Sequence, residues 1–72
     1  EHIEKAIRQL PPQCQKIFIM NRFNDKSITQ IAEELEISPR TVEKHIEIAL
    51  KKLRQELADY LPAGLFLWLL NI

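Results

Sequence analysis

The sequence has only one glycine, one cysteine and one tryptophan among its 72 residues. Because turn-forming residues are scarce, the composition favours helices that are joined by short connections. A single cysteine excludes an internal disulfide and a cysteine-based zinc site, which fits a reducing compartment. The sequence contains no Gly-rich phosphate loop, metal-ligand spacing or Ser/His/Asp set, so we expect no cofactor, no metal and no enzymatic activity.

The sequence also lacks net charge and a long apolar run. Ten basic residues balance ten acidic ones, which removes any argument for nucleic-acid binding from the whole-chain charge. Positive charge is nevertheless concentrated, because residues 38–54 hold five basic side chains and two acidic ones. The longest apolar run, 65–70, is much shorter than the about 20 residues that span a bilayer. With no signal peptide at the start, we expect a cytoplasmic protein and, since the chain opens without Met, a piece of a longer one.

The spacing of apolar residues predicts an all-α fold, a small helical domain of about four helices with winged elements absent. A short first helix is expected to end at Leu10, where two prolines stop it, and a second to run from Pro12 to about Phe23. We expect this domain to span residues 1–61 and a hydrophobic C-terminal tail to span 62–72. The predicted buried residues of the first two helices are Ile3, Ala6, Ile7, Leu10, Cys14, Ile17, Phe18 and Met20.

Serines are expected to cap the third and fourth helices. Ser27 stands three residues before Gln30, which is the spacing of a capping box. Ser38 precedes Pro39, a favourable pair for the N-cap and the first helical position, and the fourth helix is expected to reach about Tyr60. Helical spacing predicts a buried stripe of Ile28, Ile31, Ala32, Leu35, Val42, Ile46, Ala49, Leu50, Leu53 and Leu57. It predicts an outward side of Arg40, Thr41, Lys44, Ile48 and Lys51.

A short capped helix, a three-residue turn and a longer helix with a basic outer side together form the plan of a helix-turn-helix motif. Ala32 supplies the small residue that close packing of the two helices needs. Arg40 is suited to guanine, Glu43 to the amino group of cytosine, and Lys44 to a base or a phosphate. Phosphate contacts are expected from Ser27, Thr29, Ser38, Lys51, Lys52 and Arg54. The plainer alternatives are that the serines only cap helices and that the charged residues only face solvent.

Several stretches resemble region four of bacterial sigma factors, and the closest type is the extracytoplasmic-function (ECF) group. They are LPPQCQKIFIMNRF at 10–23, SITQIAEEL at 27–35, ISPRTVEKHI at 37–46 and ALKKLR at 49–54. The LPxxxxxxFxxxRF pattern is the most specific of them. The resemblance implies a domain that recognises the minus-thirty-five promoter element in the major groove and docks on the β-flap of the RNA polymerase core. It also implies an anti-sigma protein as a partner.

The resemblance also assigns residues by position. Pro39, Arg40, Glu43 and Lys44 would face bases, and Ser27, Thr29, Ser38 and Thr41 would lie near phosphates. Two departures stand out. Glu36 occupies a position where many such motifs have glycine, so the turn must reach its geometry in another way, such as a strained left-handed residue. Pro39 has no backbone N–H to offer a phosphate.

Two alternatives remain at this point. The stretch from Thr41 to His45 also resembles the DNA-binding output domain of LuxR-type response regulators, although LPPQC at 10–14 does not match their usual opening. The other alternative is a protein-interaction module driven by the apolar tail, which is expected to be buried within the chain or in a homodimer. The tail residues assigned to partner binding are Leu65, Phe66, Trp68 and Leu69.

Overall fold

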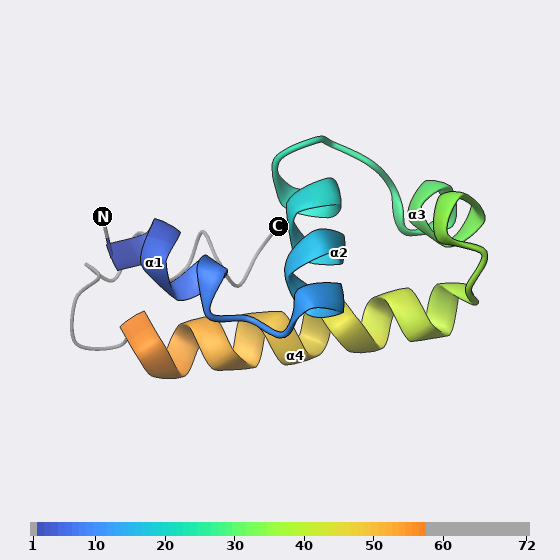
Figure 1. The fold of residues 1–72 in the computed structure, drawn as a ribbon. Coiled ribbons are helices and arrows are strands. Elements are labelled where there is room, and N and C mark those ends of the chain that lie inside the picture. Colours follow the sequence, from blue (N-terminus) through green and yellow to red (C-terminus); the bar gives the residue numbers. More distant parts are fainter. Residues whose placement is uncertain (1, 58–72) are drawn as a thin grey trace.

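The computed structural model describes residues 2–57, so the tail residues Leu65, Phe66, Trp68 and Leu69 and the domain boundary predicted at 61 lie outside the described part. The helices are α1 (His2–Arg8), α2 (Pro12–Arg22), α3 (Ile28–Leu35) and α4 (Pro39–Leu57). No strand occurs within residues 2–57, and the predicted all-α fold is confirmed. Helix α4 forms a long base, with α3 beside its N-terminal end, α2 across its middle and α1 along its C-terminal half (Figure 1).

Two apolar clusters lie along α4, and α2 contributes to both. The first cluster comprises Ala6, Ile7, Leu10, Cys14, Phe18, Ala49 and Leu53, and lies between α1, α2 and the second half of α4. The second cluster comprises Ile17, Met20, Ile31, Ala32, Val42 and Ile46, and lies between α2, α3 and the first half of α4. Ile17 and Phe18 are both fully buried although they are sequence neighbours, because they enter different clusters. Helix α2 is therefore covered on two adjoining sides at this point, and Lys16 marks the side that stays exposed.

Two details differ from the sequence-based expectation. Helix α1 ends at Arg8 instead of Leu10, because a residue before proline disfavours helical backbone, although Leu10 is still buried. Ile48 does not face outward as predicted. It is partly buried and packs against the first cluster, because contact with neighbouring helices widens the covered side of α4 beyond the stripe that helical spacing marks.

The connection between α2 and α3 is held by side chains as well as backbone. Asp25 has a left-handed φ of 57°, which turns the chain without a glycine. The Asn21 side-chain amide donates to the carbonyl of Lys26 at 2.9 Å, and the Lys26 N–H donates to the carbonyl of Met20 at 3.0 Å. An ion pair between Lys26 and Glu34 then links the connection to α3. Being partly exposed, this pair adds little stability, and the backbone contacts set the direction in which α3 begins.

A polar contact crosses the first cluster between α2 and α4. The Cys14 Sγ lies 3.2 Å from the His45 Nδ1, and Cys14 is only 3% exposed. Burial raises the pKa of the Cys14 thiol, and the positive charge of Lys52 opposes this only in part. The thiol therefore stays protonated at neutral pH and can donate to the Nδ1 of a neutral histidine.

We expect Cys14 to react at least about tenfold more slowly with iodoacetamide in the folded chain than in urea at pH 8, because burial and the raised pKa both reduce thiolate attack. Mass spectrometry over time measures this directly, since the chain has no second cysteine. The folded state also holds the thiol proton to higher pH than the unfolded state does. Its free energy of unfolding should therefore fall as pH rises above the ordinary thiol range. Equal alkylation rates in the two states would contradict the burial.

Candidate nucleic-acid interface

The turn between α3 and α4 depends on one left-handed residue. Glu36 has φ 57° and ψ 44°, and its N–H donates to the carbonyls of Ala32 and Glu33. The N–H of Ile37 donates to the carbonyl of Ala32 at 3.0 Å. This arrangement is a Schellman-type helix end, in which the left-handed residue is usually glycine. The left-handed conformation that the sequence suggested for Glu36 is confirmed. It redirects the chain into α4 within three residues.

Side-chain caps fix the first residue of both helices in the motif. The Ser27 Oγ accepts from the Gln30 N–H at 3.1 Å, and the Gln30 Oε1 accepts from the Ser27 N–H at 2.8 Å. The predicted capping box is therefore confirmed. The Ser38 Oγ accepts from the Thr41 N–H at 3.1 Å, as expected of an N-cap. Each such cap is worth about 1 kcal/mol, and together they determine which side chains stand on the first turns of α3 and α4.

Apolar packing between α3 and α4 determines which side of α4 faces outward. Ala32 is 5% exposed, and Ile31 and Val42 are fully buried between the two helices. Leu35 and Ile37 are partly buried and pack against the same cluster. The close packing predicted at Ala32 and the burial predicted for Ile31 and Val42 are confirmed. Since this side of α4 is filled, the opposite side is the one that can meet a partner.

Four exposed charged residues share that outer side. Arg40, Glu43, Lys44 and Glu47 line a shallow depression of about 370 Å³. Their spacing of three, four and seven residues places them on one face of a helix. The structure therefore brings together three of the four predicted base-facing residues. Pro39 is exposed at the start of α4 but is not part of the lining. Glu47 was missed as a site residue, although its spacing from Lys44 was visible in the sequence.

The hydroxyl side chains predicted to contact phosphate lie at the starts of two helices, and all of them are exposed. They are Ser27 and Thr29 at α3 and Ser38 and Thr41 at α4. The hydroxyl oxygens of Ser38 and Thr41 are 2.9 Å apart, and either can be the donor. Because one proton serves this contact, the other hydroxyl proton stays available to an acceptor. Helix starts carry partial positive charge, so these are favourable positions for an anion.

The three basic residues predicted near the end of the motif do not share one face. Lys51 is exposed and lies three turns beyond Arg40 on the same side of α4, at about 100° per residue. Lys52 instead lines a separate groove with Ala6, Gln9 and Leu10, between α1 and α4. Arg54 is half-buried, and its Nε donates to the carbonyl of Leu50 over a long 3.4 Å. Lys51 is thus the one of the three that extends the outer charged side.

A family model described as Sigma-70, region 4 matches residues 1–53. The chain belongs to the sigma-70 region 4 family. The resemblance predicted from the sequence is confirmed, and this sigma region 4 domain is a DNA-binding domain for promoter recognition. The family is one of transcription factors and not a known enzyme family. No curated protein and no solved structure matches the chain.

The sequence pattern that marked the family places two noteworthy residues at the end of α2. Phe23 is 52% exposed and packs edge-on against Phe18, with ring centroids 6.2 Å apart. The neighbouring Arg22 has a buried Nε that meets no hydrogen-bond acceptor within the described chain, and burial lowers the pKa of its guanidinium. The sigma region 4 domain therefore presents a large aromatic ring beside a partly desolvated cation, on a part of α2 that the helix-turn-helix does not use.

Residues 2–57 contain neither a cluster of metal-ligating side chains nor a helix suited to span a membrane. No three histidine, cysteine or acidic side chains there come close enough together to hold a metal ion. No helix of the described chain has the length and apolar content needed to cross a membrane.

Replacing Glu36 by glycine should raise the free energy of unfolding of this sigma region 4 domain by up to about 1 kcal/mol, because glycine carries no left-handed penalty. In a domain of this size that corresponds to a melting temperature about 4–8 °C higher. Glu36→Val should be destabilising, because a β-branched side chain is poorly tolerated at positive φ. Thermal unfolding followed by circular dichroism measures both effects.

The matched control is Glu33→Gly, at an exposed position within α3. It should lower the free energy of unfolding by about 1 kcal/mol, as glycine does in a helix interior. If Glu36→Gly destabilised the domain as much as Glu33→Gly, the left-handed turn would not be a source of strain.

Proposed function

We propose that this domain recognises the minus-thirty-five promoter element through the outer side of α4 while it docks on the β-flap of the RNA polymerase core. The observation that carries the proposal is the depression in which Arg40, Glu43 and Lys44 stand together, on the first turns of a helix that α3 holds in place. An exposed helix with hydrogen-bonding side chains on its first turns fits the width of the major groove.

Within this proposal each charged side chain has a distinct partner on the base edges. Arg40 donates both arms of its guanidinium to O6 and N7 of a guanine, and Lys44 donates to a neighbouring acceptor. Glu43 accepts from the amino group of a cytosine. Each good contact of this kind discriminates against a wrong base by about 1–3 kcal/mol.

Phosphate contacts then hold the helix at the correct depth. Ser27 and Thr29 at the start of α3 and Ser38 and Thr41 at the start of α4 lie where the groove edges would run. Because Pro39 has no N–H and the N–H of Thr41 is engaged by Ser38, the amide of Arg40 is the one left for a phosphate at the first turn of α4. Lys51 adds attraction that weakens with salt.

Docking on the polymerase compensates for the weak long-range attraction between the domain and DNA. With formal net charge zero, the chain has little long-range attraction for DNA on its own. Tethering to the polymerase raises the effective concentration of the domain at the promoter and makes weak contacts sufficient. The exposed Phe23 beside Arg22 supports α2 as part of the docking surface. The proposal also places the domain in the cytoplasm. It further includes an anti-sigma protein that competes with the polymerase for such surfaces.

The double substitution Arg40→Ala with Lys44→Ala should lower affinity for the preferred element by about 10- to 100-fold per lost base contact while changing binding to unrelated DNA much less. Lys51→Ala should weaken binding to all sequences alike and reduce the slope of log K against log salt by about 0.9. Fluorescence anisotropy at several salt concentrations, with the chain tethered beside the element by a fused DNA-binding module, measures both.

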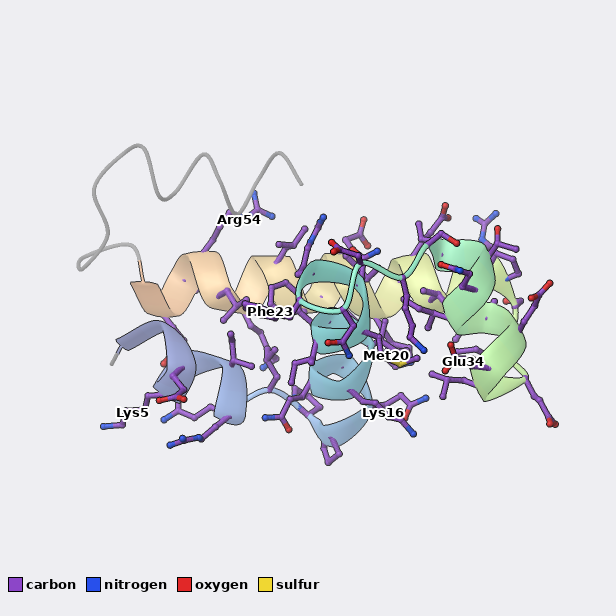
Figure 2. All side chains as sticks on the ribbon, turned by 90° about the horizontal axis from the view of Figure 1, so that it is seen from above. Lys5, Lys16, Met20, Phe23, Glu34 and Arg54 are labelled. Atoms are coloured by element: carbon purple, nitrogen blue, oxygen red, sulfur yellow. The ribbon has the colours of Figure 1, made fainter. Side chains whose placement is uncertain are left out.

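Lys5→Ala is the matched control, because Lys5 is exposed on α1 at the end of the molecule opposite α3 (Figure 2). It should leave site-specific binding unchanged. Equal losses on preferred and unrelated DNA for the Arg40/Lys44 double variant would remove base reading from the proposal.

A further inference from the structure

We infer that Glu47 is a second acidic base-reading residue, and that it selects a base whose amino group lies in the major groove, cytosine or adenine, beyond the base that Glu43 reads. The inference rests on the proposed function, because it requires α4 to lie in the major groove. It extends that function by assigning a specificity role to a residue outside the first turns of α4.

The position of Glu47 supports this role. It is exposed and lines the same depression as Arg40, Glu43 and Lys44. It stands one turn after Glu43, which is about 6 Å further along the helix axis. Successive base pairs are about 3.4 Å apart along the DNA axis. Because the groove is inclined to the DNA axis, a helix lying along it carries the two carboxylates about one to two base pairs apart.

No side chain of α4 forms an ion pair with Glu47. The ion pairs of residues 2–57 are Glu4 with Arg8 and Lys26 with Glu34, so neither Lys44 nor Lys51 is within ion-pair distance of Glu47 there. Two like charges four residues apart on a helix are modestly destabilising. Lys44 and Lys51 stand three and four residues from Glu47 and oppose this repulsion, and the Glu47 carboxylate stays available to a hydrogen-bond donor on a partner.

The chemistry of the major groove restricts what such a donor can be. An ionised carboxylate only accepts hydrogen bonds. Guanine and thymine offer it only acceptors and a methyl group in this groove, whereas cytosine N4 and adenine N6 donate. Phosphates repel it. A carboxylate at position 47 therefore favours a cytosine or an adenine opposite it, just as Arg40 and Lys44 favour acceptor-rich guanine. The four side chains together read a pattern of donors and acceptors instead of simply attracting DNA.

The test compares base preferences of single variants on a library in which each base pair of the element is varied in turn. The chain is tethered beside the element by a fused DNA-binding module, and binding is read by sequencing of the bound fraction. Glu47→Gln and Glu47→Ala should each reduce the preference for cytosine or adenine at one position by about tenfold. Glu43→Gln should act at a different position, about one to two base pairs away.

Glu56→Gln is the matched control, since Glu56 is exposed on the same helix but lines the groove toward α1. It should change no base preference. A uniform gain in affinity of the Glu47 variants on all sequences, with base preferences intact, would show that Glu47 only repels DNA. Unchanged binding would show that it only faces solvent. Either result overturns the inference alone, provided that Arg40→Ala still loses its own base preference. If base preferences stayed unchanged in both the Arg40 and the Glu47 variants, the proposed function itself would be overturned.

Discussion

The apolar side of α4 is the constraint on which the rest of the structure depends. Four buried residues lie along it, Val42 and Ile46 in the second cluster and Ala49 and Leu53 in the first. The three shorter helices therefore all pack against one surface. A helix whose inner side is filled over this length has only one side left for a partner. A shift of one residue in its register would rotate each later side chain by about 100° and would break both clusters. Core packing therefore determines which side chains of α4 face outward in this sigma region 4 domain.

The outer side of α4 carries both signs of charge. Two acidic residues stand among the basic ones at Glu43 and Glu47, on a chain with no net charge. Such a surface attracts phosphates less than a uniformly basic one would, and it keeps groups that can form directional hydrogen bonds. Under the proposed function this balance suits a module that the polymerase delivers to its site, because delivery replaces long-range electrostatic steering.

Much of the fold could be predicted from the sequence because much of it is locally encoded. The capping box of Ser27 and Gln30, the cap at Ser38 and the buried stripe of α4 each depend on residues a few positions apart. The errors concern packing between distant segments. Ile48 is covered through tertiary contacts that its own spacing does not reveal, and the contact of Cys14 with His45 joins residues 31 positions apart. The sequence predicts the same phosphate contact for Lys51 and Lys52, because it does not reveal that α1 lies beside Lys52 and forms a groove with it.

The serine caps also bear on how the chain reaches its native state. Each cap closes a loop of only three residues, so the entropy lost on closure is small. The partners of α1 on α4, by contrast, lie more than 40 residues away in the chain. Native contacts close in sequence form quickly and distant ones slowly. The half of the domain formed by α3 and the first part of α4 is thus expected to assemble first, with α1 closing onto it afterwards.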